Sequence, residues 1–255
     1  MVALALACGA AAAQGPPPPP HGFGPPPDAI GVQGFAAGFN DKVVAGAPYS
    51  ATISTQTSQT LPDGNQIQRT TTGTVARDSQ GRTRRDVTLK SIGPWAASGN
   101  AAPHFVLIND VVAGASYALQ PDLKTAQKLP QRSGRKNKNG AREDRNNVVT
   151  TPLGSQTISG LVAEGTRYTR TIPAGAIGNE KPIVITTERW YSSDLQTVVM
   201  TRRSDPRTGE TVFTLSNIQR AEPDASLFQV PADFTVTQGR PGRGLGQSLG
   251  QPPVQ

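Results

Sequence analysis

The feature that most constrains this chain is a repeated alternation of β-branched or apolar residues with polar ones, broken at short intervals by turn signals. The stretch YSATISTQTSQT (49–60) is rich in Thr, Ser and Ile, and LPDGN (61–65) follows it. Asp-Gly is a strong signal for a tight hairpin. The chain then returns as QIQRTTTGTVARD (66–78). Alternating segments joined by short turns predict antiparallel strands rather than βαβ units.

The same pattern continues through most of the chain. Further strands are predicted at 82–92, 104–110, 116–120, 125–130, 157–172 (one or two strands), 182–191, 196–204 and 210–220. Residues 222–228 predict one helical turn, 230–236 predict an extended closing segment, and 34–44 is the other weak helix candidate. Together these elements predict a mostly β fold. We expect a curved antiparallel sheet or incomplete β-barrel of about nine or ten strands, with little helix.

The first thirteen residues predict a signal peptide. Residues 1–13 form a short apolar run, and Ala11 and Ala13 fit the A-x-A pattern with a cut before Gln14. The run is shorter than the roughly 20 residues that span a bilayer, so we expect no transmembrane segment after processing. The predicted location is the periplasm or cell envelope. A lipid anchor at Cys8 is the alternative, although ALAC is a poor lipobox.

Composition divides the rest of the chain. Residues 14–42 predict a Pro/Gly-rich tether, and 238–255 predict a disordered tail, because neither segment has much apolar surface to bury. Residues 43–237 are then long enough for one β-domain with its own core, and they include a basic loop at 131–147. The chain has no cysteine beyond the predicted cleavage site. Disulfides and cysteine-ligated metals are therefore excluded from the mature chain.

The net charge of +7 is unevenly distributed. The loop 131–147 has six Lys or Arg against two Asp or Glu, and Arg240 and Arg243 lie in the tail, so the remainder is nearly neutral. A basic loop can contact anionic partners, but the simpler interpretation is a solvated loop. No aromatic residue falls in 131–147, so single-stranded nucleic acid would find no stacking platform there. We expect no nucleic-acid partner.

The histidine content argues against an enzyme. The chain has two histidines, and His21 lies in the predicted tether. A Ser-His-Asp arrangement would need His104 beside Ser192 or Ser193, and no G-x-S-x-G elbow is present. We expect His104 to be an ordinary residue at the start of a strand. The prediction is that the protein has no catalytic residue.

Metal and cofactor sites are not predicted either. One histidine in the β-domain and no mature cysteine cannot make a zinc site without several carboxylates. A carboxylate pair for glycoside hydrolysis stays open, because such residues need only meet in space. The available carboxylates are Glu164, Glu180, Glu188 and Asp194. Glu188 is more typical of a cross-strand ion pair.

The stretch KPIVITTERWYSSDLQ (181–196) tests these interpretations locally. Ser192, Ser193 and Asp194 are typical turn residues, whose side chains we expect to hydrogen-bond their own backbone. Trp190 and Ile183 have opposite parity, so on a regular strand they face opposite sides. We therefore expect either Ile183, with Ile185 and Tyr191, or Trp190 to face the core.

Aromatic residues are the remaining candidates for a site. Trp95, Phe105, Tyr117, Tyr168, Trp190, Phe213 and Phe228 are spread over separate predicted strands or loops. They either fill the core of the curved sheet or partly line a cavity on its concave side, since a sheet that does not close leaves an apolar trough. The candidate ligand-binding residues are Trp95, Phe105, Tyr117 and Trp190. We expect the trough to be apolar and partly vacant.

Several stretches carry a family resemblance. TTTGTVARDSQGRTRRDVTL, GSQTISGLVAEGTRYTRTIPAGAIGNEKPI, ERWYSSDLQ, SDPRTGE and SNIQRAEPDASLFQVPADF look like an uncharacterised family of exported bacterial proteins. More remotely, the order of parts resembles the lipoprotein-carrier (LolA-like) superfamily, with Gly154, Ile158 and Gly160 in a G-x-x-x-I-x-G strand. This resemblance implies an incomplete antiparallel barrel whose concave face shelters acyl chains or a partner's segment. It implies no catalytic residue and no cofactor.

These observations predict an exported, non-catalytic binding protein for lipid, lipoprotein or another apolar ligand. The alternative is an envelope structural or sensing protein that acts through protein-protein contacts, by its sheet edges or the basic loop. A hydrolase is the third hypothesis, and it requires a cleft with at least two converging carboxylates.

Overall fold

The computed structural model describes residues 43–88, 104–129 and 148–239. These residues form twelve strands in one sheet and two short 3-10 helices. The first strands are β1 (Tyr49–Thr60), β2 (Gln66–Arg77), β3 (Thr83–Thr88), β4 (His104–Asp110), β5 (Ala115–Gln120) and β6 (Thr125–Leu129). The later ones are β7 (Val148–Ile158), β8 (Leu161–Ile172), β9 (Ile183–Ser192), β10 (Thr197–Asp205), β11 (Gly209–Gln219) and β12 (Thr235–Gln238). The 3-10 helices are η2 (Pro121–Leu123) and η3 (Ala225–Phe228).

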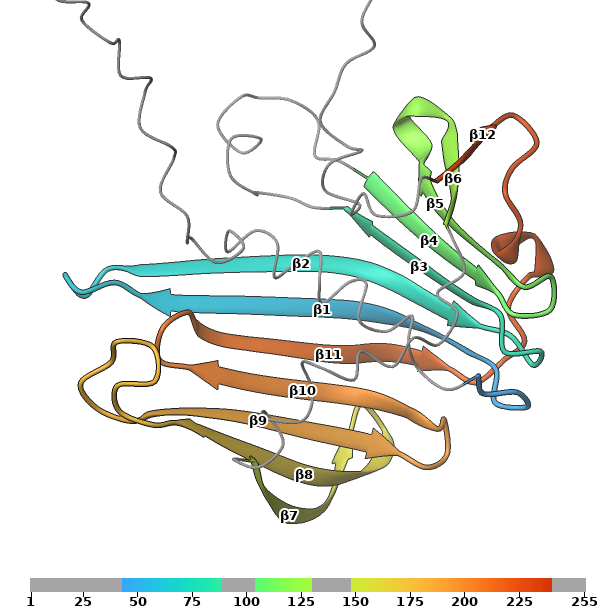
Figure 1. Ribbon diagram of the computed structural model, residues 1–255. Coiled ribbons are helices and arrows are strands. Elements are labelled where there is room, and N and C mark those ends of the chain that lie inside the picture. Colours follow the sequence, from blue (N-terminus) through green and yellow to red (C-terminus); the bar gives the residue numbers. More distant parts are fainter. Residues whose placement is uncertain (1–42, 89–103, 130–147, 240–255) are drawn as a thin grey trace, which may run out of the picture.

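The sheet is open. Its strand order is β12-β6-β5-β4-β3-β2-β1-β11-β10-β9-β8-β7, so β12 and β7 are its two edges (Figure 1). Neighbouring strands are antiparallel except for β12 and β6, which run parallel. The predicted class, a curved and mostly antiparallel sheet with little helix, is confirmed. No helix in the described ranges is long and apolar enough to cross a membrane.

The strand count exceeds the predicted nine or ten. The segment 157–172 holds the turn between β7 and β8, where Ser159 and Gly160 both have positive φ (49° and 80°), and β7 extends back to Val148. Pro152 and Gly154 interrupt the alternating pattern of β7, so the first part of this strand was not predicted from the sequence. Val43 and Val44, the described end of the weak helix candidate, are not helical. The predicted signal peptide, tether and basic loop lie outside the described residues, as does nearly all of the predicted tail.

Cross-strand register defines two faces of the sheet. Tyr49, Ala51 and Ile53 on β1 share one side with Val75 and Arg77 on β2 and with Leu215 on β11. We call this side of the sheet the inner face and the opposite side the outer face. On the other strands, the residues that pair with inner-face residues also belong to the inner face.

A cluster of buried residues shows that the sheet curls over its inner face. This core cluster consists of Tyr49, Ala51, Ile53, Val75, Ile158, Leu161, Ala163, Trp190, Leu195, Val199 and Leu215. Its members come from strands as far apart in the sheet as β2 and β7. Six strand steps of about 4.8 Å would separate these strands by about 29 Å in a flat sheet. Side chains can meet across that separation only because the sheet bends around them.

Arg77 ties this curled end together. Its Nε and Nη2 atoms donate to the Ala47 carbonyl at 3.0 and 2.7 Å, and Nη2 also donates to the carbonyl of Leu195 in the β9–β10 turn. The guanidinium lies 4.8 Å from the Tyr49 ring centroid, a cation–π contact. Burial lowers the pKa of Arg77 because it disfavours the charged form. One side chain thus joins the start of β1, the end of β2 and a distant turn.

The outer face has a smaller core. Val106, Ile108, Leu119 and Ala126 are buried on β4, β5 and β6, and Val230 and Phe234 pack against them. The chain after β11 therefore covers this part of the outer face. The predicted helical turn at 222–228 is confirmed as η3, whose Asp224 cap accepts from the Ser226 amide at 2.8 Å. The predicted closing segment becomes a strand only from Thr235.

The expectation that only one parity of β9 would face a core is wrong. Ile185 is 3% exposed and Trp190 is 7% exposed, although they have opposite parity. The register between β9 and β10 shifts by one residue between Val198 and Met200, next to Trp190. The β8–β9 register is regular from Trp190 to Ile185, so these side chains lie on opposite sides of β9 and both sides of this strand are covered.

Trp190 is tightly packed against its cross-strand neighbour. It pairs with Gly165 on β8, and a Cβ atom added to Gly165 would lie 2.6 Å from the Trp190 ring. Gly165 is therefore required by the close approach of the ring. Ser192 is buried and its hydroxyl has no hydrogen-bond partner, so the expectation that it bonds its own backbone is also wrong. The turn is instead closed by the Gln196 amide, which donates to the Ser193 carbonyl at 3.3 Å.

Candidate functional site

The inner face changes character along the strands. On β1 the first residues are buried and the last are exposed, and β2 shows the reverse order because it runs antiparallel. Past Ile53 most inner positions of these strands are polar: Thr55 lies opposite Thr71, and Thr57 opposite Arg69, before Gln59 meets Ile67. The core cluster therefore fills one end of the curled sheet and the inner face continues beyond it.

The neighbouring strands add apolar side chains to this continuation. Phe213 on β11 pairs with Thr55 and with Thr201, and both Phe213 and Thr201 are partly buried. Ile185 on β9 pairs with Arg170 on β8 and is almost fully buried. The inner face of the described residues is thus amphipathic, with aliphatic and aromatic groups among threonines and arginines. The trough was expected to be apolar; in the described residues its apolar side chains are mixed with polar ones, because the inward positions of the Thr-rich strands carry hydroxyl and basic groups.

The predicted ligand-binding residues do not converge. Phe105 lies on the inner face of β4, opposite Val87. Tyr117 lies on the outer face of β5 and packs against the small core that the C-terminal segment covers. Trp190 belongs to the core cluster. Trp95 is outside the described residues. Ligand binding by each of them stays a prediction, but Phe105 and Tyr117 lie on opposite faces and cannot line one cavity.

The described residues hold no serine–histidine pair and no group of three or more His, Cys, Asp or Glu placed to bind a metal. His104 contacts Asp86, with its Nε2 atom 2.6 Å from Oδ1, and the hydroxyl of Ser192 has no partner. Glu188 forms the expected cross-strand ion pair, 2.7 Å from Arg167 Nη2. Asp194 accepts from Arg220 at 2.6 Å. These ion pairs account for two of the four carboxylates considered for hydrolysis.

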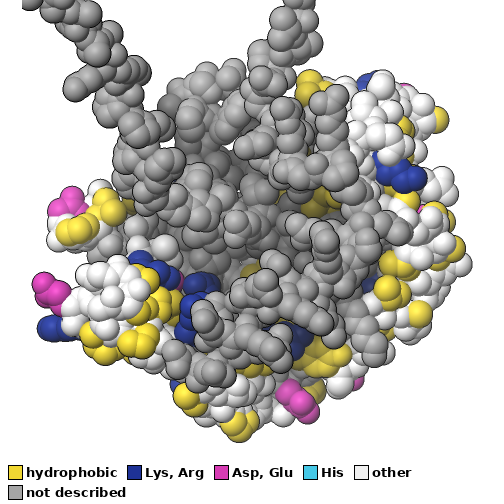
Figure 2. Space-filling view, in the orientation of Figure 1, with side chains coloured by type: hydrophobic (Ala, Val, Ile, Leu, Met, Phe, Trp, Pro, Cys, Tyr) yellow, Lys and Arg dark blue, Asp and Glu magenta, His cyan; other side chains and the backbone are white. Residues whose placement is uncertain are grey.

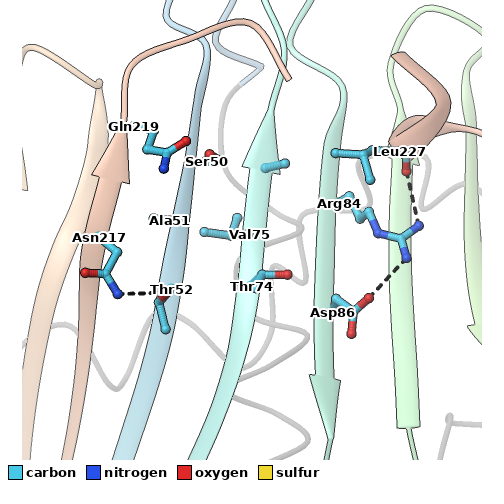
Figure 3. Close-up of a pocket in the computed structure, with 11 residues that line it drawn as sticks. Ser50, Ala51, Thr52, Thr74, Val75, Arg84, Asp86, Asn217, Gln219 and Leu227 are labelled. Carbon is cyan, nitrogen blue, oxygen red and sulfur yellow. Dashed lines mark hydrogen bonds and ion pairs between the residues drawn. The ribbon is translucent and has the colours of Figure 1, made fainter. Parts of the chain in front are cut away.

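A polar pocket lies on the outer face, where sequence reasoning placed nothing. Its volume is about 330 Å³. It is lined by Ser50, Ala51, Thr52, Thr74, Val75, Ala76, Arg84, Asp86, Asn217, Gln219 and Leu227 (Figure 3). The floor is made of β11, β1, β2 and β3, and η3 contributes one wall. A pocket built on four paired strands has a preorganised floor.

Register explains why these polar groups gather. Two parallel rows of side chains cross the sheet: Gln219, Ser50, Ala76 and Arg84 form one, and Thr52, Thr74 and Asp86 belong to the other. Neighbouring members of a row lie on adjacent strands, about 4.8 Å apart. The sequence did carry one sign of this pocket. Residues 49–60 have Ser or Thr at both odd and even positions, so both sides of the predicted strand are polar, whereas a strand with one solvated face needs polar residues on that side alone.

Two contacts shape the pocket wall. The Arg84 guanidinium donates to the Leu227 carbonyl at 3.2 Å and to Asp86 Oδ2 at 3.1 Å (Figure 3). Asn217 has a positive φ of 51° at the point where the β1–β11 register shifts, and its amide donates to the Thr52 hydroxyl at 3.3 Å. A non-glycine residue in this conformation is uncommon and is held by its surroundings.

Comparisons with known proteins find only remote likenesses. No protein-family model matches the sequence, and no curated protein matches it. The solved structure of a LolA superfamily protein from Nitrosomonas europaea is 10% identical, covers 73% of this chain and 91% of that chain, and has a TM-score of 0.29. The Mycobacterium tuberculosis lipoprotein LppX is 15% identical, covers 77% of this chain and 97% of that chain, and has a TM-score of 0.33.

The MucA/MucB complex of Pseudomonas aeruginosa is also similar. It is 12% identical, covers 74% of this chain and 58% of that chain, and has a TM-score of 0.42. The present chain thus spans less than two thirds of that structure's chain. All three likenesses are of low sequence identity and low TM-score.

Proposed function

We propose that the protein is a non-catalytic binding protein, exported to the periplasm or cell envelope, that holds an apolar or amphipathic ligand on the inner face of its open sheet. The ligand class is a lipid or the acyl part of a lipoprotein. The observation that carries this proposal is that the core cluster fills only one end of the curled sheet. On the inner face beyond it, Phe213 packs against the edge of the core cluster and Ile185 is buried, and both lie among threonines and arginines.

This mixture suits a ligand with an apolar chain and a polar end. Each methylene removed from water contributes about 0.8 kcal/mol, so a chain of several methylenes can be held without a catalytic group. Apolar side chains also surround the β8–β9 loop, at the lower left of Figure 2, where Ile177 is 58% exposed. An exposed apolar rim beside the inner face is the kind of surface at which a lipid first makes contact.

The test is photo-crosslinking of the full chain to vesicles that contain a phospholipid with a diazirine-bearing acyl chain. We expect crosslinked peptides from the inner face of β8, β9 and β11. Absence of crosslinks, or crosslinks confined to outer-face residues, would refute the lipid-binding function.

Two neighbouring residues of β11 provide a matched pair of variants. Phe213 lies on the inner face and Val212 on the outer face, and both are partly buried. Phe213→Ser is expected to reduce crosslinking severalfold, whereas Val212→Ser leaves it within twofold of the unmodified protein. Equal losses in both variants would show that the inner face is not the binding surface.

A second candidate function is strand pairing with an envelope protein at the β7 edge. Every residue of β7 before Leu153 is exposed, and Val148 and Val149 are 37% and 65% exposed. The uncharged, β-branched run Val148–Thr151 lies on an edge whose outer backbone groups have no neighbouring strand in the sheet. Replacing Val149 with proline removes one backbone donor. Capture of an envelope partner that is unaffected by Val149→Pro would exclude this edge as the contact.

A further inference from the structure

The outer-face pocket suggests a second binding site, separate from the inner face. It is an open depression in the sheet surface, and several of the polar side chains that line it make no side-chain hydrogen bond to another described residue. The hydroxyls of Ser50 and Thr74 and the amide of Gln219 have no side-chain hydrogen bond within the described ranges. Ser50 is partly buried, while Thr74 and Gln219 are exposed at the rim. These are three groups that can each donate and accept a hydrogen bond to a ligand.

The charges of the pocket are balanced. Arg84 and Asp86 form an ion pair at 3.1 Å, and His104 contacts the other oxygen of the same carboxylate. A single negative charge entering the pocket would meet Asp86, and a single positive charge would meet Arg84. The electrostatics therefore favour a neutral ligand over a strongly charged one.

The spacing of the groups favours a ligand with several hydroxyls. Ser50 and Gln219 lie directly opposite each other on adjacent strands, and Thr74 occupies the other row, opposite Asp86. A ligand that spans both rows meets donors and acceptors at regular strand intervals of about 4.8 Å. Ala76 and Leu227 supply apolar surface between the polar groups, which suits the C–H face of a sugar ring.

We propose that this pocket binds a neutral saccharide. The volume of about 330 Å³ lies at the lower end of the range of small-molecule pockets, about 300–1,000 Å³. The pocket is on the opposite side of the sheet from Phe213, so its occupation is independent of lipid binding on the inner face.

The experiment is an array of immobilised neutral and acidic saccharides probed with the full chain, followed by calorimetric titration of the neutral saccharide that binds most strongly. The double variant Ser50→Ala with Gln219→Ala removes two of the ligand-facing groups. We expect its affinity to fall by about tenfold or more, the effect of about 1.4 kcal/mol. Thr74→Val, at the exposed rim, is expected to weaken binding in the same direction without disturbing the fold.

A matched control is available on the same face of the sheet. Ser58 and Gln68 are opposite each other on β1 and β2, both exposed and both outside the pocket. The double variant Ser58→Ala with Gln68→Ala is expected to bind the saccharide within twofold of the unmodified protein. The proposal is overturned if no neutral saccharide binds, if only acidic saccharides bind, or if the pocket variant binds as tightly as the control.

Asp86→Asn tests the charge argument separately. This change keeps the shape of the side chain but leaves the pocket with a net positive charge from Arg84. Acidic saccharides are expected to gain affinity relative to neutral ones. An unchanged preference would show that charge balance does not select the ligand. Since Phe213→Ser leaves the pocket intact, failure of lipid binding and failure of saccharide binding give distinguishable results.

Discussion

The two ends of the curled sheet are made from the same strands but are stabilised differently. At the closed end, the inward side chains of β1, β2 and β11 are buried in or beside the core cluster, namely Tyr49, Ala51, Ile53, Val75, Arg77 and Leu215. At the open end, Thr55–Thr60 and Gln66–Thr71 are intermediate or exposed, and the strands end in turns. Pairing is continuous from one end to the other, so backbone hydrogen bonding does not distinguish them. Side-chain burial does.

The open end depends on turn chemistry instead of burial. In the β10–β11 turn, the Asp205 carboxylate accepts from the Arg207 amide at 3.1 Å and from its guanidinium at 2.8 and 3.0 Å. Asp205 is 2% exposed, although it is the last residue of β10 and lies far along that strand from Val199 of the core cluster. A fold that concentrates its apolar burial at one end leaves the other end free to vary in side-chain content. This division supports the placement of a binding surface on the inner face of the open end.

The largest expected effect on the free energy of unfolding comes from truncating a core side chain at the closed end. Leu215 is 2% exposed within the core cluster, and Leu215→Ala is expected to lower the free energy of unfolding by about 4 kcal/mol through lost transfer energy and a residual cavity. Thr211→Ala, on the inner face of the same strand toward the open end, is expected to cost less than about 1 kcal/mol. Urea denaturation of both variants measures the difference. Similar losses would break the distinction between the two ends.

A smaller effect is expected from removal of the Arg77 contacts. Arg77→Met keeps an unbranched buried side chain but leaves the Ala47 and Leu195 carbonyls without their donor. The expected loss is about 2–3 kcal/mol, because hydrogen bonds to a charged group are being removed at a buried site. Arg202→Met is the control, since Arg202 is 49% exposed and its ion pair with Glu210 is long, at 3.9 Å. If both changes cost the same, Arg77 does not hold the curl.

At the open end the expected effect depends on pH. Hydrogen bonds from Arg207 lower the pKa of Asp205 from 3.8 to about 2. Because the folded-state value is below the unfolded one, this contribution is fully present above pH 4 and is lost as the pH falls through 2. The pKa shift of Asp205 corresponds to at most about 2.5 kcal/mol of folding stability. Because both arginine partners are exposed to solvent, we expect a contribution of about 2 kcal/mol.

The measurement is the free energy of unfolding from pH 6 to pH 2 for the unmodified protein and for Asp205→Asn. The variant is expected to be less stable at pH 6 and to lose about 2 kcal/mol less than the unmodified protein as the pH falls. Parallel pH profiles would show that the turn carboxylate does not contribute to the open end.

The strands could be predicted because alternation and turn residues are local properties. The segment HFVLIND coincides with β4, and the Asp63-Gly64 turn joins β1 to β2 as expected. The strand β7 was harder to predict, because Pro152 and Gly154 break its alternating pattern and the register shifts between them. The parallel pairing of β12 with β6 depends on how the C-terminal segment crosses the outer face, which local sequence does not determine.

The candidate sites were harder to predict than the fold. The ligand-binding residues predicted from the sequence were aromatic, but Trp190 is packed against Gly165 and Tyr117 lies under the C-terminal segment. The outer-face pocket depends on which residues of separate strands stand opposite one another. Ser50 meets Gln219 only through a register that shifts at the Asn217 bulge. Such cross-strand pairings depend on the tertiary structure and cannot be derived from the spacing of residues along one strand.

The smallest expected effect on stability is at the open end of β1. Thr57 lies on the inner face of β1 at the open end, opposite Arg69 and Thr211, and is partly buried. Thr57→Val keeps the β-branched shape and is expected to change the free energy of unfolding by less than about 0.5 kcal/mol. If the open end holds an acyl chain, the added apolar surface should increase crosslinking to the diazirine phospholipid. Ser58→Val, on the outer face one residue away, should not. An equal response in both variants would mean that the open end of the inner face has no special affinity for lipid.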